Sequence, residues 1–535
     1  MPPKSAYQGS SKSLLETIDG RSTMRDFKDM FAALMSTVPL TEHRVRFRKV
    51  EDTFTSEDAM APLACLKVTQ RHTVPDHSDP TKTVQTTTST TWSMGRDMAR
   101  STCQQLVDAR FIEAADGKVY PQFPTKGAIW QVTPKGCTIL KRWVDRNGQP
   151  APQLEALCEK AQMQLVVLER DMDTDRISLD KTTVEVVFRR MCGMEGPNLK
   201  ANTTLSDSDS VSDYATGLVG VKMAKDRRVM NKTVPYTFMG KAAADWLQDC
   251  CTTIDRRECL QLCESFVRAQ LMAPVIEDRN YQRQFPSETH FQPTKNAIYA
   301  VTEKGQRICG WLARPVSMSS EESTESDHEK VKIPRDTNMN RFNMIVHDPA
   351  LRMLFREHLK MSLCEENLNF WMDVQGLLKV YHNGRKENGV VKPEYVKDCL
   401  ATAYNLYNSF LATGAPSELN IDHSLRHRLD EQIIQTETDN DVQRARLERI
   451  LHLIELAASS VAKLMASDSV PKFLRDTRYQ SIIREHQIDM QLAQRALSPA
   501  PVPGSPSTIE TAPSPASTSS NEKPVLSRSN TSRKG

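Results

Sequence analysis

HLKMSLCEENLNFWMDV, residues 358–374, sets the fold class of the C-terminal part of this chain. Its apolar residues recur at spacings of three and four, which is the period of an amphipathic helix. The same pattern runs from Met344 to about Gln487, and it is broken by NGRKENG, TGAPSE and Pro471. Because such breaks separate helices, residues 336–490 are expected to form an all-α helical bundle.

Two downstream segments give this bundle a family resemblance. SELNID, residues 417–422, and LMASDSVPKFLRD, residues 464–476, follow the EENLNFW core in that order. The three segments together resemble the regulator of G-protein signalling (RGS) family, and large aromatics such as Trp371 and Phe473 are expected in its core. The resemblance implies contacts with a GTP-bound Gα subunit from Glu366, Asn367, Asn420, Leu464, Asp468 and Lys472.

The resemblance also implies a GTPase-activating role without a catalytic residue on this chain. A Gα subunit carries its stabilising arginine in cis and needs only a rigid arrangement of its switch segments and of the glutamine that orients water. Asn420 is expected to touch that glutamine. The alternative is an RGS-homology scaffold that binds Gα or other partners without accelerating hydrolysis. The chain departs from the family pattern at Leu363 and Cys364, where Tyr and Ser are common, and at Lys472, where Arg is common.

The N-terminal half contains an internal repeat. PTKGAIWQVTPKG at residues 124–136 and PTKNAIYAVTEKG at residues 293–305 match at nine of thirteen positions. In each copy a helix precedes a short β-like run, and a Thr-x-Lys-Gly turn then opens another helix. An aromatic stands before an earlier helix in both copies, where Ser56 in the first can cap the helix and Gly240 occupies the same place in the second.

The repeat resembles the DEP domain, a small winged-helix-like module. FMGKAAADWL, followed by helices ending in ARFIE or AQLMA, carries this resemblance. The second copy matches better, because a Thr-rich insert, TVQTTTSTTW, interrupts the first. The fold class expected for the whole chain is therefore two α+β winged-helix-like DEP modules followed by the all-α RGS bundle.

Two basic stretches in these modules are candidates for docking on receptor tails or anionic membrane surfaces, as the DEP resemblance implies. In RVRFRK, residues 44–49, alternation would place the arginines on one strand face; KMAKDRRVMNK, residues 222–232, is the second stretch. The alternative is a solvated basic face. The candidate patch residues are Arg44, Arg46, Arg48, Lys225, Arg227 and Arg228.

Composition limits the remaining functions. With 70 basic and 67 acidic side chains, no global field attracts nucleic acid, and DNA binding by the winged helices is not expected. No phosphate-binding glycine loop, zinc helix or nucleophile elbow is found, so no enzyme activity, cofactor or metal is expected. The twelve cysteines lack a metal or disulfide spacing, which indicates reduced thiols. A cytoplasmic protein recruited peripherally to the plasma membrane is predicted, because no signal peptide or membrane span is found in the sequence.

Ser-rich and acidic segments divide the chain. In the tail, Ser498, Ser505 and Ser514 each precede Pro and are candidate phosphorylation sites. The predicted order is a disordered N-terminus (1–22), a first DEP-like domain (23–150), a connector (151–213), a second DEP domain (214–315), an acidic linker (316–335), the RGS domain (336–490) and a disordered tail (491–535).

Overall fold

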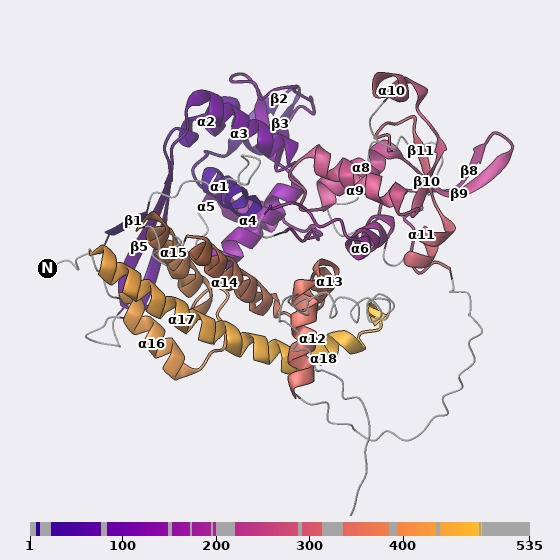
Figure 1. Ribbon diagram of the computed structural model, residues 1–535. Coiled ribbons are helices and arrows are strands. Elements are labelled where there is room, and N and C mark those ends of the chain that lie inside the picture. The colour runs from indigo at the N-terminus through magenta and orange to yellow at the C-terminus, as the bar shows by residue number, and fades with distance from the viewer. Residues whose placement is uncertain are drawn as a thin grey trace, which may run out of the picture. The chain divides into compact units, whose positions relative to one another are not determined.

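The computed structural model describes residues 7–10, 23–75, 83–147, 152–171, 174–193, 196–199, 220–286, 291–312, 335–384, 393–434, 439–480 and 483. Along the chain, two modules that combine helices with a sheet precede a bundle of helices (Figure 1). Residues Met1–Ser481 form one compact unit, and every contact described below lies within it.

The first module builds a four-stranded sheet with helices around it. The strand order is β2-β3-β7-β6, and all neighbours are antiparallel. Its strands are β2 (Thr41–Val45), β3 (Arg48–Thr55), β6 (Ile112–Ala114) and β7 (Ile129–Val132). Its helices are α1 (Met24–Met35), α2 (Ser56–Leu63), α3 (Arg96–Asp108), α4 (Pro134–Asn147) and α5 (Pro152–Glu159).

The second module repeats this arrangement. Its sheet runs β8-β9-β11-β10, so each strand takes the place of its counterpart in the first sheet. The strands are β8 (Ala224–Val229), β9 (Lys232–Met239), β10 (Met272–Ile276) and β11 (Ile298–Val301). The helices are α8 (Gly240–Cys250), α9 (Arg256–Arg268), α10 (Arg279–Gln284) and α11 (Glu303–Ile308). The predicted internal repeat is confirmed, and the second copy adds the short helix α10 between β10 and β11.

The repeated Thr-x-Lys-Gly turn makes the same hydrogen bond at the start of a helix in both copies. The hydroxyl of Thr133 accepts the backbone N–H of Gly136 at 3.0 Å, and Thr302 accepts that of Gly305 at 3.0 Å. A Cβ on Gly136 would lie 2.2 Å from the carbonyl oxygen of Phe111, and one on Gly305 would lie 2.1 Å from a carbonyl oxygen. Both glycines are therefore required by close approach of the backbone.

The N-cap of helix α2 differs from the predicted one by one residue. Thr55, not Ser56, is the N-cap of α2, and it forms a capping box with Asp58. The hydroxyl of Ser56 accepts the indole N–H of Trp130 at 3.0 Å instead. In the second copy Gly240 leaves room for Tyr299, which takes the place of that tryptophan.

The Thr-rich insert forms a sheet of its own. Strands β4 (Leu66–Pro75) and β5 (Thr83–Trp92) pair along their whole length. Strand β1 (Tyr7–Ser10) pairs with β5 in parallel, so the segment 1–22 contains a strand where disorder was expected.

A connector joins the two modules by hydrogen bonds. Val166 of the connector forms a parallel bridge with Cys251 of the second module. Helix α6 (Lys181–Cys192) follows, with Asp180 as its N-cap and Gly193 as its C-cap. Lys135 makes a second link, because its buried ammonium donates to the carbonyl oxygens of Gln248 at 2.7 Å and of Thr253 at 2.8 Å.

The C-terminal part is a helical bundle, as predicted. Asp348 caps α13, and Phe355, Phe370 and Phe473 are buried in its core. The expectation that Trp371 belongs to this core is wrong, because Trp371 is half-buried and lines a cavity. Its helices are α12 (Arg335–His347), α13 (Pro349–Met361), α14 (Glu365–Asn383), α15 (Pro393–Leu406), α16 (His423–Ile434), α17 (Asn440–Leu464) and α18 (Val470–Arg475). Two π-helical segments, η1 (Tyr407–Leu411) and η2 (Met465–Ser469), follow α15 and α17.

The continuous helical run Asp441–Arg475 is long and apolar enough to cross a membrane by composition alone. However, 56% of its most apolar stretch is buried inside the structure, which is typical of a core helix.

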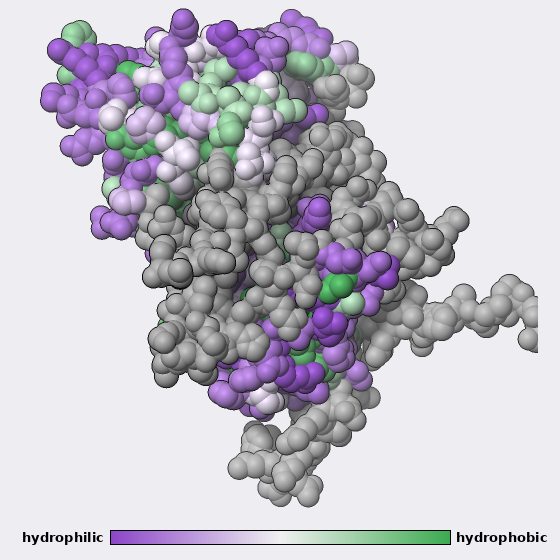
Figure 2. Space-filling view, turned by 90° about the vertical axis from the view of Figure 1, so that its left-hand side faces the viewer, coloured by the Kyte–Doolittle hydropathy of each residue, from purple (hydrophilic) through white to green (hydrophobic). Residues whose placement is uncertain are grey.

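On the face in Figure 2, hydrophilic residues border a smaller group of apolar residues in the upper described part. All twelve cysteines are free thiols, and most are buried.

Candidate functional site

The start of helix α14 carries the first two predicted Gα-contact residues. Glu366 and Asn367 lie in the first turn of α14 and are half-buried. The Asn367 amide donates to the carbonyl oxygen of Cys364 and to Glu366 Oε1, both at 3.3 Å. Burial raises the pKa of Glu366, and the neighbouring Glu365 carboxylate acts in the same direction. These two side chains are thus held locally at the end of the bundle.

Leu363 is a candidate contact residue that the family pattern did not supply. It is 89% exposed and has a φ of 54°. The N–H of Leu363 bonds to the Lys360 carbonyl and that of Cys364 to the Leu359 carbonyl, which is a Schellman motif. Glycine is usual at the left-handed position, so a strained, exposed leucine beside Glu366 and Asn367 points to a role in binding.

Replacing Leu363 by glycine separates stability from binding. Leu363→Gly should keep or raise the thermal stability of the bundle by up to about 1 kcal/mol, because the left-handed strain disappears. Affinity for Gα should nevertheless fall roughly ten- to hundredfold, because an apolar contact of about 1.5 to 3 kcal/mol is lost. Calorimetry and a binding titration measure the two effects. Unchanged affinity would exclude Leu363 from the interface.

The loop between η1 and α16 exposes the side chain of Asn420. Its chain neighbours Leu419 and Ile421 are buried, with exposed fractions of 2% and 8%, whereas Asn420 is exposed. The N–H of Leu419 donates to the carbonyl oxygen of Phe410 in η1 at 2.8 Å. The ring of Phe410 lies 5.6 Å from that of Phe370 in α14, which links this loop to the helix that carries Glu366.

The third group lies along α17, η2 and α18. Leu464, Asp468 and Lys472 are exposed, and the Lys472 ammonium lies 2.7 Å from an Asp468 carboxylate oxygen. Their spacing of four places them along one face. Pro471, near the start of α18, lacks the N–H that a regular helix needs, and the π segment precedes it. Single π turns are frequent at functional sites.

The electrostatics of Cys364 show that the first and third groups are neighbours. Burial raises the pKa of the Cys364 thiol, the carboxylates of Glu366 and Asp468 raise it further, and Lys472 opposes them. Five of the six predicted contact residues, all except Asn420, are therefore tied to two adjacent structural elements, α14 and the α17–η2–α18 run.

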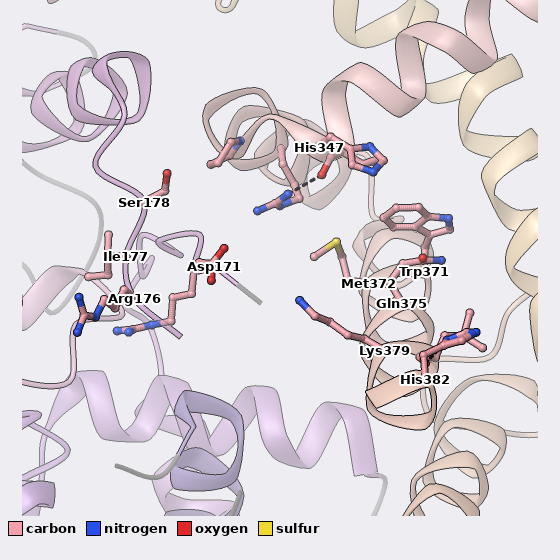
Figure 3. Close-up of a pocket in the computed structure, with 15 residues that line it drawn as sticks. Asp171, Arg176, Ile177, Ser178, His347, Trp371, Met372, Gln375, Lys379 and His382 are labelled. Atoms are coloured by element: carbon pink, nitrogen blue, oxygen red, sulfur yellow. Dashed lines mark hydrogen bonds between the residues drawn. The ribbon is translucent and has the colours of Figure 1, made fainter. Parts of the chain in front are cut away.

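A separate cavity of about 610 Å³ lies between the connector and the bundle (Figure 3). Asp171, Arg176, Ile177 and Ser178 line it from the connector. Trp371, Met372, Gln375, Lys379 and His382 of α14 face them, with His347 at the end of α12.

The two basic stretches form hairpins. The first does not put its arginines on one strand face: the chain turns at Arg46 and Phe47, between Val45 of β2 and Arg48 of β3. The second turns at Met230, between β8 and β9. Phe47 is 94% exposed and Met230 is 93% exposed, so each tip carries an apolar side chain among cations. Ser498, Ser505 and Ser514 lie outside the described residues.

The fold and the exposed groups at the end of the bundle define the class of this protein as an RGS-domain regulator of G-protein signalling. The RGS family model, "Regulator of G protein signaling domain", matches residues 341–482. The DEP model matches residues 220–301. Residues 26–160 match a different model, "Fungal-differentiation regulator winged helix domain", so one DEP domain is found where two were predicted.

Known proteins place the chain more closely. It is 49% identical over 502 residues to the developmental regulator flbA of Emericella nidulans, covering 93% of this chain and 69% of flbA. The chain therefore belongs to the flbA family of RGS proteins. It is 23% identical over 474 residues to Regulator of G-protein signaling 1 of Schizosaccharomyces pombe, covering 87% and 92%. Human Regulator of G-protein signaling 7 is 28% identical over 169 residues, covering 31% and 29%. These relatives imply a Gα subunit as partner.

Proposed function

We propose that this protein is a GTPase-activating protein for a heterotrimeric Gα subunit and thereby ends receptor signalling. The observation that carries the proposal is the exposed set of acidic, amide and apolar side chains at the end of the RGS bundle, held by buried neighbours. Bonds that form best with the transition-state arrangement of the Gα switches lower the barrier to hydrolysis. A gain of about 3 to 4 kcal/mol corresponds to roughly a few hundredfold to a thousandfold in rate.

The test is single-turnover GTP hydrolysis by a purified Gα subunit of the inhibitory-like class, with and without the full chain. Acceleration supports the proposal. Binding to several Gα subunits without acceleration would instead favour the scaffold function. The name of its relative flbA further supports a place for this activity in fungal development.

The first winged-helix module is, in our proposal, a diverged second DEP copy. The identical strand order of the two sheets and the shared roles of Gly136 and Gly305 support this. On this basis both modules would recruit a cytoplasmic protein to the plasma membrane or to a receptor tail.

The hairpin tips favour a membrane contact. An apolar tip among cations suits the boundary of an anionic bilayer, where the ring or thioether inserts and the cations meet lipid charge. The first hairpin carries Arg44, Arg46 and Arg48; the second carries Lys225, Arg227 and Arg228.

Phe47→Ser together with Met230→Ser should lower binding to vesicles that contain phosphatidylserine at least tenfold, because two apolar contacts of about 2 kcal/mol are lost. Co-sedimentation measures this. The matched control is Met98→Ser, since Met98 is an exposed apolar residue of α3 and is not part of a hairpin. Wild-type binding that ignores lipid charge and salt would rule out the membrane contact.

A further inference from the structure

The carboxylate of Glu169 joins the connector to the RGS bundle. Glu169 is 6% exposed. One of its oxygens accepts Arg352 Nε at 2.8 Å, and the other accepts Arg356 Nε at 3.2 Å. Burial by itself opposes ionisation, but the guanidinium groups of Arg356 and Arg352 outweigh it and lower the pKa of Glu169. An ionised carboxylate therefore sits between two cations of helix α13.

The second winged-helix module holds Glu169 in place from the other side. The backbone N–H of Leu168 donates to the Thr252 hydroxyl at 2.9 Å. Arg170 binds the Glu258 carboxylate through two bonds of 2.7 Å, and both side chains are more than nine-tenths buried. The residues before and after Glu169 are thus fastened to the module, so its carboxylate has little freedom to follow a moving partner.

Arg356 extends this connection to the predicted Gα site. Its Nη1 donates to the Asn369 amide oxygen and lies 3.7 Å from a Glu365 carboxylate oxygen. Glu365 and Asn369 belong to the first turns of α14, which also carry Glu366 and Asn367. The N-cap of this helix, Cys364, makes no side-chain capping bond. The orientation of these turns therefore depends on Arg356 more than it would in a capped helix.

Packing cannot replace this ionic link along the neighbouring part of α14. Arg170 and Arg352 line the cavity, and the side chains of Met372 and Lys379 lie across it from the connector (Figure 3). Beyond it, Asp373 of α14 binds Arg25 at 3.0 Å and Arg146 at 2.7 Å. Ion pairs therefore connect this part of α14 to the N-terminal half, and at its first turns Arg142 of α4 also acts electrostatically on Glu365. Hydrogen bonds to the first turns come through Arg356, which Glu169 holds.

We propose that Glu169 is a positioning residue for the Gα site. Through Arg356 it orients the first turns of α14, so that the N-terminal half contributes to GTPase activation as well as to recruitment. The inference rests on the proposed function for its effect on rate. A planar guanidinium can hold Glu169 and Asn369 together in a fixed fork, which an ammonium cannot do.

The test compares four variants of the full chain. Glu169→Gln and Arg356→Lys break the link. Arg352→Lys keeps a cation beside Glu169, and it leaves the bonds from Arg356 to Glu169 and Asn369 intact. Arg190→Gln weakens the same interface elsewhere, because Arg190 of α6 pairs with Glu357 of α13 and not with α14. Hydrogen exchange at amides 368–370, among the first that can bond within α14, is measured on each free protein, and GTP hydrolysis is measured with Gα.

The expected result is faster exchange at amides 368–370 in Glu169→Gln and Arg356→Lys, with wild-type exchange there in the two controls. The maximal stimulated rate should fall roughly ten- to hundredfold in the first two variants, because small misplacements of binding groups have effects of that size. Unchanged exchange in Glu169→Gln, or equal losses in Arg190→Gln, would overturn the inference. A wild-type protein that never stimulates hydrolysis would count against the proposed function, while the exchange measurement still decides the inference.

Discussion

Asn420→Ala should cut the stimulated rate of GTP hydrolysis by roughly a hundredfold, with little change in the stability of the bundle. Asn420 is exposed between two buried residues, Leu419 and Ile421, so its amide points away from the core. Loss of one well-placed polar contact that forms in the transition state typically costs a factor of about 100 to 1,000 in rate. Substitutions of exposed side chains usually change stability by less than about 0.5 kcal/mol.

Single-turnover hydrolysis with the full chain measures this effect, and thermal unfolding checks the fold. Asn383→Ala is the matched control, because Asn383 is an exposed asparagine at the far end of α14. It should leave the rate unchanged. Equal rates for Asn420→Ala and wild type would remove Asn420 from the site, even if the protein proved to be an activator.

Glu258→Ala should destabilise the N-terminal half by about 3 to 5 kcal/mol, which is the usual cost of leaving one partner of a buried ion pair uncompensated. Arg170 and Glu258 are 9% and 8% exposed, and the same carboxylate accepts the backbone N–H of Ile254 at 2.9 Å. Urea unfolding followed by circular dichroism measures the loss.

Two controls limit the interpretation of that loss. Asp145→Ala breaks an exposed pair with Lys141, whose side chains are 59% and 49% exposed, and it should cost less than about 1 kcal/mol. The double variant Arg170→Met with Glu258→Leu should recover much of the stability, because two apolar side chains need no counterion. A Glu258→Ala loss no greater than that of Asp145→Ala would show that the buried pair does not hold the module together.

The repeat and the bundle were predictable because their causes are local. Gly136 and Gly305 stand where a Cβ would strike a carbonyl oxygen, and the threonine three positions earlier caps the next helix. Because these requirements are short-range, the same residue types occur at the same places in both copies. The periodic apolar residues of α14 and α17 likewise reflect burial on one side of each helix.

The features that were missed depend on contacts between distant residues. Glu169 meets Arg352 across 183 positions, and a single acidic residue in a linker gives no sign of such a partner. Strand β1 forms by pairing with β5, which lies more than 70 positions away in the chain. The composition of residues 1–22 gives no sign of that pairing and therefore indicated disorder. The basic stretch at 44–49 alternated as a strand does, but a two-residue turn at Arg46 and Phe47 splits it between two strands.

The roles of individual residues in the predicted Gα site could be predicted from the sequence only in part. The exposure of Asn420 and Lys472 agrees with contact roles, yet their identity came from the family resemblance and not from periodicity. Leu363 appeared only as a departure from the family pattern, because its left-handed backbone and exposure become visible in the folded loop alone.

The π turn η2 separates a change in chain length from a change in the site. A wider turn accommodates one residue more than a regular helix would, and each residue of an α-helix advances the direction of the side chains by about 100°. Deleting a single residue between Met465 and Ser469 would convert the wide turn into a regular one and leave Lys472 and Phe473 in nearly the same directions relative to Leu464. The same deletion within the regular part of α17 would rotate everything that follows, so that Phe473 would leave the core or Lys472 would leave the surface. Relatives that are one residue shorter at this turn can therefore present the same site, whereas relatives that are one residue shorter in α17 cannot.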